Sequence, residues 1–118
     1  MPKDDHQPMT PTVNILGLTY KVERVPYILR DEYRIGQLDA EKQEIKILDG
    51  LSEELDAQTL LHEIIHGIFK QLKRFDEDND EELVQGLALG LHSYLKGAPL
   101  PGTIKAVLQK TDTPPKIA

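Results

Sequence analysis

The sequence predicts an α+β fold in which a small antiparallel sheet packs against two or three helices. Two observations carry this prediction. Residues 12–48 contain short runs of β-branched and apolar residues in partial alternation, which is typical of strands with one buried face. From Ser52 onward, the apolar residues recur instead at the three- and four-residue intervals of an amphipathic helix. The change of period near Ser52 therefore divides the chain into a sheet-forming half and a helical half.

The N-terminal half begins with strand patterns. Residues 12–25 carry β-branched and aromatic residues in partial alternation and predict one strand that bends at Gly17. Residues 27–33 follow a proline and are ambiguous, because a short helix or turn suits them as well as a strand does. Further along, residues 34–39 and 44–48 alternate on either side of a polar stretch, and these two segments predict an antiparallel hairpin.

A first helix is expected over residues 52–74. Its apolar residues stand at positions 61, 64, 65, 68, 69 and 72, which is helical spacing. Either Ser52 or Asp56 could cap its start, and basic residues near its end suit a helix C-terminus.

A second helix is expected over residues 80–97, after a polar break at 75–80. It ends at Gly97, ahead of two prolines. Residues 102–110 have a pattern that could add a short terminal helix.

The length and composition favour one domain with two short tails. The chain has 118 residues, of which 39% are hydrophobic and 29% charged, as in folded globular proteins. Residues 1–12 and 111–118 are rich in proline and polar residues, so we expect flexible tails around a domain at 13–110.

The charge and residue usage exclude several kinds of site. The net charge is −6 and the basic residues are scattered, which argues against nucleic acid or an anionic membrane as the main partner. The absence of cysteine excludes disulfides and thiol catalysis, so any zinc site must use His, Asp or Glu. No segment has the length and hydrophobicity of a membrane span or a signal sequence, and a cytoplasmic location is therefore expected.

His62, Glu63 and His66 form the pattern H-E-x-x-H within the first expected helix. Residues four apart lie on the same helical face, so the two imidazoles can bind one metal ion. Glu63 is rotated by ~100° from His62, where it can take a proton from a water molecule that Zn²⁺ activates. The alternative is a structural helix whose polar side chains are satisfied by hydrogen bonds.

The residues around this motif resemble the active-site helix of zincin metallopeptidases. That family favours Thr or Val three positions before the first histidine, uncharged residues beside both histidines, and an apolar residue two positions after the second. This chain has matching residues at those places, namely Thr59, Leu60, Ile64, Ile65, Gly67 and Ile68. The resemblance implies a minimal zincin-like fold, bound Zn²⁺ and hydrolysis of peptide bonds.

A catalytic zinc site needs a third protein ligand beside the two histidines. The metzincin pattern places glycine and histidine where this chain has Phe69 and Leu72, so that subclass is excluded. In gluzincins the ligand is a glutamate of the following helix, which here offers Asp80, Glu81 and Glu82. Glu81 lies within roughly 70° of the centre of that helix's apolar stripe, whereas Glu82 points away and Asp80 suits an N-cap. Glu81 is therefore the predicted third ligand.

His92 is the only later histidine. It lies near Glu81 in angle but ~16 Å further along the helix, too far to share the ion. We expect an ordinary histidine at the edge of the helix, with a role in the cleft near the substrate as the alternative.

The second expected helix also resembles that of the ImmA/IrrE-type metallopeptidases. In these proteins H-E-x-x-H is followed by E-x-x-A-N-x-F-A, whose glutamate is the third ligand. Glu81 stands at the glutamate and Ala88 at the last alanine, whereas Val84, Gln85 and Leu87 replace the Ala-Asn pair and the phenylalanine.

The overall plan is similar to compact proteins of this kind encoded by phages and mobile elements. Those proteins carry Y-x-V and G-x-L-D stretches before the metal helix, and Tyr20–Val22 and Gly36–Asp39 stand at these places. The resemblance spans roughly residues 13–95. Because enzymes of the ImmA/IrrE type cleave or inactivate repressors, it implies a regulatory protein as substrate.

The sequence thus predicts a zinc metallopeptidase that acts on a protein or peptide. His62, His66 and Glu81 would bind the zinc, and Glu63 would be the general base. Three alternatives stay open: a non-catalytic zincin-like protein that binds metal and docks a partner, a metal-dependent hydrolase of another bond such as a phosphodiester, and a structural helix without metal. The sequence does not indicate an oligomeric state.

Overall fold

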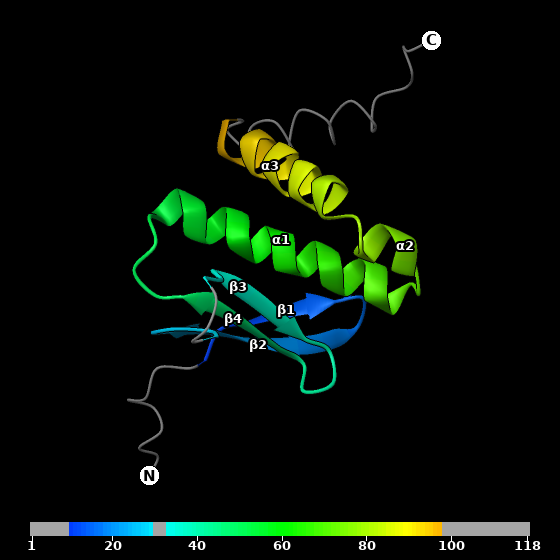
Figure 1. The fold of residues 1–118 in the computed structure, drawn as a ribbon, viewed down its shortest axis with the longest axis horizontal. Helices are drawn as coiled ribbons and strands as arrows, with labels where there is room; N and C mark the ends of the chain where they lie inside the picture. The colour runs from blue at the N-terminus through cyan, green and yellow to red at the C-terminus, as the bar shows by residue number, and fades with distance from the viewer. Residues whose placement is uncertain (1–9, 30–32, 98–118) are drawn as a thin grey trace, which may run out of the picture.

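The computed structural model describes residues 10–29 and 33–97 (Figure 1). These residues form a four-stranded sheet and three helices, which confirms the predicted α+β class. The elements follow one another as β1 (Thr12–Ile15), β2 (Leu18–Val25), β3 (Gly36–Asp39), β4 (Glu44–Leu48), α1 (Glu53–Gln71), α2 (Phe75–Asp78) and α3 (Glu81–Gly97).

The sheet is mixed, although an all-antiparallel sheet was expected. Its strand order is β1-β2-β4-β3, with antiparallel pairs at both edges and a parallel pair of β2 and β4 in the centre. After β2, the chain passes to the far edge to form β3, and β4 then returns into the space between them. Alternation indicates which residues are strands, but it does not indicate this crossover.

Residues 12–25 form a hairpin and not the single bent strand that was expected. Leu16 and Gly17 both have positive φ values, 48° and 96°, as in the two-residue loops that join antiparallel strands. The side chain of Asn14 accepts a hydrogen bond from the Gly17 N–H at 2.8 Å and stabilises this turn. The expected hairpin of residues 34–39 and 44–48 is confirmed as β3 and β4.

The helix boundaries agree closely with the expected ones. Ser52 is the N-cap of α1, where its hydroxyl accepts a hydrogen bond from the Leu55 N–H at 3.1 Å. Asp80 precedes α3 and accepts from the Leu83 N–H at 3.0 Å, as an N-cap does. The polar break contains one short helix, α2. Residues 27–29 form neither helix nor strand.

The remaining expectations fall on residues outside the described ranges. These are residues 30–32, the terminal helix at 102–110, residues 1–9 of the tail expected at 1–12, and the tail at 111–118. Thr12, the last residue of the expected N-terminal tail, is instead the first residue of β1. Among the described helices, none is long and apolar enough to cross a membrane.

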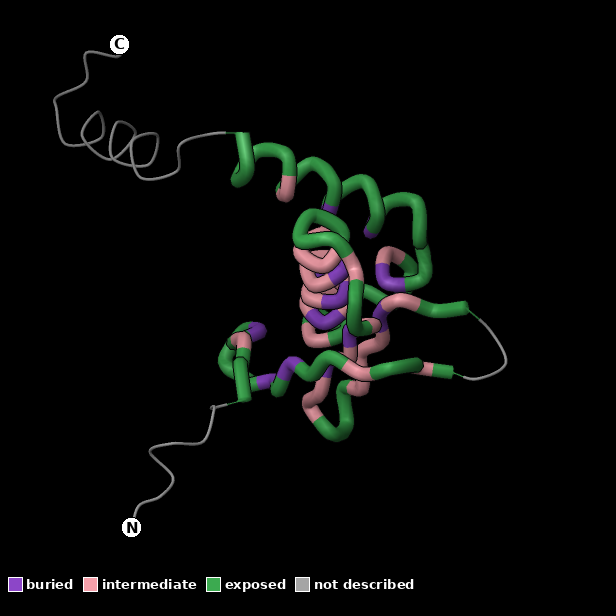
Figure 2. The backbone as a smooth tube through the Cα atoms, turned by 90° about the vertical axis from the view of Figure 1, so that its left-hand side faces the viewer, coloured by how far each residue is buried: buried purple, intermediate pink, exposed green. Residues whose placement is uncertain are grey.

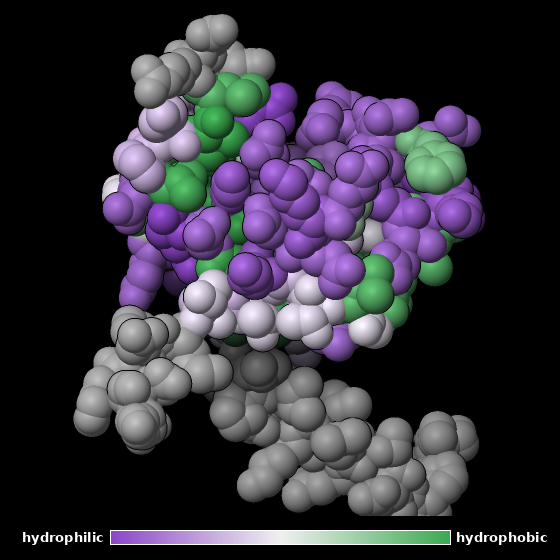
Figure 3. Space-filling view, turned by 90° about the horizontal axis from the view of Figure 1, so that it is seen from below, coloured by the Kyte–Doolittle hydropathy of each residue, from purple (hydrophilic) through white to green (hydrophobic). Residues whose placement is uncertain are grey.

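α1 is the middle layer of the structure, with the sheet on one side and α3 on the other (Figures 1 and 2). On the sheet side, its apolar residues cover a cluster formed by Ile15, Tyr20, Val22, Ile45 and Ile47. On the opposite side, Ile65 packs against Val84 and Ala88 of α3. The outer face of the sheet is largely hydrophilic (Figure 3). The polar side chains of α1 that meet α2 and α3 lie beside these two apolar surfaces.

Gly67 allows α1 to lie close to the sheet. A Cβ atom at this position would stand 2.8 Å from Cδ1 of Ile15 and 3.1 Å from Cδ1 of Leu38, closer than ordinary van der Waals contact. The glycine directly follows His66, so it brings the motif turn of α1 against the sheet.

Candidate metal centre

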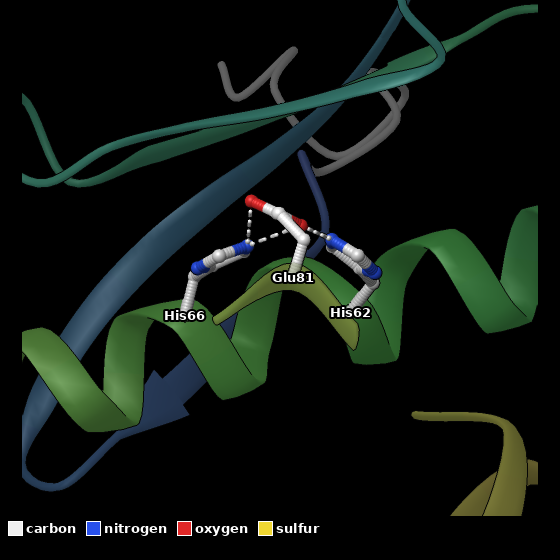
Figure 4. Close-up of side chains that lie close together, drawn as sticks. All are labelled: His62, His66 and Glu81. Atoms are coloured by element: carbon white, nitrogen blue, oxygen red, sulfur yellow. Dashed lines mark hydrogen bonds and ion pairs between the residues drawn. The ribbon is translucent and has the colours of Figure 1, made fainter. Parts of the chain in front are cut away.

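The structure brings together the three side chains that the sequence predicts as metal ligands. His62 and His66 project from successive turns of α1, and Glu81 reaches them from the first turn of α3 (Figure 4). One donor atom from each lies within 4.8 Å of the donor atoms of the other two. Nε2 of His62 is 3.1 Å from Oε1 of Glu81, and Nε2 of His66 is 3.2 Å from Oε2.

The other nitrogen of each imidazole is already bonded. Nδ1 of His66 lies 2.7 Å from Oδ1 of Asp78, and Nδ1 of His62 lies 2.7 Å from Oε1 of Gln85. Both partners present oxygen atoms, so each Nδ1 carries the proton and donates it. In the neutral imidazoles, Nε2 then presents a lone pair toward Glu81.

This arrangement fits a cation. Two imidazole lone pairs and a carboxylate face a common point, and three acceptors so close together repel one another unless a cation or extra protons lie among them. Two imidazoles and one carboxylate form a donor set that suits Zn²⁺ and leaves a fourth position for water or substrate. The Glu81 side chain is 69% exposed, so this position can be reached from solvent.

Asp78 is one of two residues beside this centre whose role sequence reasoning missed; the other is Gln85. Asp78 is 6% exposed and sits between two cationic or hydrogen-bonding partners, with Oδ1 on His66 and Oδ2 accepting from Nζ of Lys70 at 2.8 Å. Burial alone would raise the pKa of this carboxyl, but the hydrogen bonds from Lys70 and His66 outweigh burial and lower it. The ionised Asp78 therefore fixes the tautomer and orientation of His66.

Glu63 is buried beside the ligands without belonging to their group. It is 8% exposed, and this burial raises the pKa of its carboxyl, although His62 and His66 oppose the rise. It faces β3 at Gly36, where a Cβ atom would lie 2.8 Å from Oε2 of Glu63 and 2.6 Å from Cγ2 of Thr59. The bare backbone of Gly36 thus makes room for the Glu63 carboxylate.

An open cleft of about 720 Å³ contains these residues. One wall consists of residues 33–35, which precede β3, and of residues 36–38, which are the first three of β3. The other wall is α1 with the start of α3, and it presents Gln58, His62, Glu63, His66, Glu81 and Gln85. β3 is an edge strand of the sheet, so one side of the cleft is bounded by a strand edge.

The metal centre is part of a longer row of polar contacts. Five polar side chains of α1 stand at intervals of four residues: Glu54, Gln58, His62, His66 and Lys70. Each has a partner on α2 or α3, namely Lys96, His92, Gln85, Asp78 and again Asp78. We call this row the polar ladder. His92 lies on it at Gln58 and does not belong to the group that could hold a metal, as its distance from Glu81 predicted.

Comparison of the chain with family models, curated proteins and solved structures finds no match. The resemblance to zincins therefore rests on the motif residues themselves, and the geometry of the site must support any function assigned to it.

Replacing Asp78 by asparagine should weaken zinc binding. The change removes the charge that orients His66 and leaves the Lys70 ammonium beside a neutral amide, so we expect a loss of about 10- to 100-fold in zinc affinity. Competition with a chromophoric chelator measures this loss. Asp76→Asn, an exposed change on the same short helix, is the matched control and should bind zinc like the wild type. Equal affinities in the two variants would contradict the role assigned to Asp78.

Replacing Gly36 by alanine should destabilise the protein. The new methyl group would press on Thr59 and Glu63, and we expect the free energy of unfolding to fall by about 1–3 kcal/mol. Gly86→Ala is the control, because a Cβ there meets nothing within 4 Å in the described structure. In that helical position alanine should raise the free energy of unfolding by about 0.5–1 kcal/mol. Urea unfolding of both variants measures the two changes in the free energy of unfolding, which should have opposite signs. A Gly36→Ala variant as stable as the wild type would show that β3 does not approach α1 so closely.

Proposed function

We propose that the protein is a zinc-dependent metallopeptidase of the zincin type. His62, His66 and Glu81 bind the zinc, and Glu63 is the general base. The observation that carries this proposal is the convergence of two imidazole lone pairs and a carboxylate beside a second, buried carboxylate at the edge of a sheet. The zincin-like residues around the motif give it independent support.

When zinc is bound, it polarises the peptide carbonyl and lowers the pKa of water in the site. Glu63 supplies the proton transfers. Its carboxylate takes a proton from the attacking water as the new C–O bond forms, and passes it to the amine nitrogen as the C–N bond breaks. A pKa raised by burial suits this role, because it brings the carboxyl closer to the working pH of the reaction.

The position of β3 favours a peptide as substrate. Among the described strands, β3 pairs with β4 alone, and its first three residues line the cleft. An extended peptide can add to the edge of β3 through main-chain hydrogen bonds, which would carry it past the metal centre. A regulatory protein with an exposed, extended segment is the substrate that this geometry and the ImmA/IrrE resemblance favour.

A non-catalytic protein that binds metal and docks a partner is the second candidate. The observation that favours it is one flank of α3, beside the stripe that packs on α1, where several large apolar side chains are exposed in the described structure: Leu83, Leu87, Leu91 and Tyr94. Such a face is typical of a surface that meets another protein.

Glu63→Gln separates the two functions. We expect at least a 100-fold loss in cleavage of a proteome-derived peptide mixture, because the amide cannot accept the proton, while zinc content stays that of the wild type. Cleavage is followed by mass spectrometry of the products. Glu82→Gln, an exposed neighbour of Glu81, is the control and should keep full activity. Equal cleavage by Glu63→Gln and wild type would refute the general-base role, and a wild type without cleavage would favour the docking protein.

A further inference from the structure

Two contacts of the polar ladder lie away from the metal centre, and one of them, between Gln58 and His92, includes a residue that lines the cleft. Nε2 of Gln58 lies 3.5 Å from Nδ1 of His92, on the turn of α1 before His62. Gln58 lines the cleft, whereas His92 stands behind it on α3 and does not. The two side chains therefore join a residue of the cleft wall to a residue outside the cleft.

Gln58 is well placed to meet an extended peptide on β3. In an extended chain, the N–H and C=O groups of alternate residues point to opposite sides. When one set pairs with the edge of β3, the other set faces the opposite wall, which is formed by α1 and α3. Gln58 lies about 6 Å from His62 along α1. This distance corresponds to about two residues of extended chain.

We propose that Gln58 binds the main chain of an extended peptide about two residues from the metal centre, and that His92 is the positioning residue that holds its amide. The proposal rests on the proposed function in taking a peptide as the ligand. It does not depend on whether that peptide is cleaved.

The contact with His92 determines what Gln58 can offer. In the tautomer of His92 that leaves Nδ1 without a proton, Nδ1 accepts one N–H of the Gln58 amide, which turns the carbonyl Oε1 and the second N–H toward other partners. Oε1 can then accept a peptide N–H, and the second N–H can donate to a peptide carbonyl. Ile35 and Leu55 also line the cleft and limit the competition from water. Without His92, the amide could rotate and would lose this preference.

Binding of hydroxamates to the zinc-loaded protein tests this proposal. The probes are acetohydroxamate, which reaches only the metal, and two hydroxamates that carry a two-residue peptide arm on either side of the zinc-binding group. Isothermal titration gives the affinity of each probe. In the wild type, one of the two arms should strengthen binding relative to acetohydroxamate, because it reaches Gln58.

Gln58→Leu should bind that longer probe about three- to tenfold more weakly than the wild type does, which is the effect of losing one or two hydrogen bonds. Its affinity for acetohydroxamate should not change. His92→Phe should show the same loss, whereas His92→Asn should restore binding, because the asparagine oxygen can replace Nδ1 as acceptor. Gln71→Leu is the matched control on the same helix but outside the cleft lining, and it should bind all probes like the wild type. Unchanged acetohydroxamate binding shows in each variant that the metal centre is intact.

Three results would overturn the proposal: equal affinity of the wild type for short and long probes, equal loss for both probes in Gln58→Leu, or no rescue by His92→Asn. These outcomes are distinct from failure of the peptidase function. An inactive protein would still bind the probes, whereas a wild type that binds no hydroxamate lacks the metal centre, and the proposal then falls with it.

Discussion

Polar side chains that are shielded from water must find partners, and the polar ladder of α1 has three of them at its centre: Gln58, His62 and His66. The apolar residues of α1 pack on the sheet and on Val84 and Ala88 of α3, and the partners of these three side chains come from α2 and α3. The polar ladder meets this constraint with partners that recur seven residues apart at positions 78, 85 and 92. The same contacts fix the crossing of α1 and α3. The placement of Glu81 over the two imidazoles follows from that crossing.

The ladder also explains why the centre is organised before any ligand arrives. The two imidazoles that could hold a metal stand on one helix, and their Nδ1 atoms are held by Asp78 and Gln85. Glu81, the third member of the group, is the exposed one, so the buried side of the candidate centre is fixed and its other side is open to solvent. Lys70 does not contact the imidazoles in this arrangement, but its ammonium donates a hydrogen bond to the buried Asp78 and lowers the pKa of that carboxyl. The metal centre is therefore a consequence of helix packing and not of a flexible loop.

Local sequence patterns predicted the elements and most of the centre. The four-residue spacing of His62 and His66 and the angle of Glu81 to the apolar stripe depend only on helix geometry, so both could be worked out from sequence. The parallel pairing of β2 with β4 could not be worked out from sequence, because it depends on the position of β3 at the far edge of the sheet. The roles of Asp78 and Gln85 were missed for the same reason, because they arise from the packing of α2 and α3 on α1. Gln85 stands at the asparagine of the E-x-x-A-N pattern, but that pattern alone did not indicate a contact with His62. The turn at Leu16 was missed because a leucine with positive φ is uncommon.

Metal content measured by mass spectrometry is the most direct test of the centre, on protein purified without chelator or added zinc. The wild type and Glu82→Ala should each carry about one zinc ion per chain, because Glu82 neighbours the ligand but points away from the site. Glu81→Ala should lose most of that zinc, since only the two imidazoles remain. A wild type that holds no metal even after zinc is supplied, or a Glu81→Ala variant that holds as much as the wild type, would contradict the three-ligand centre.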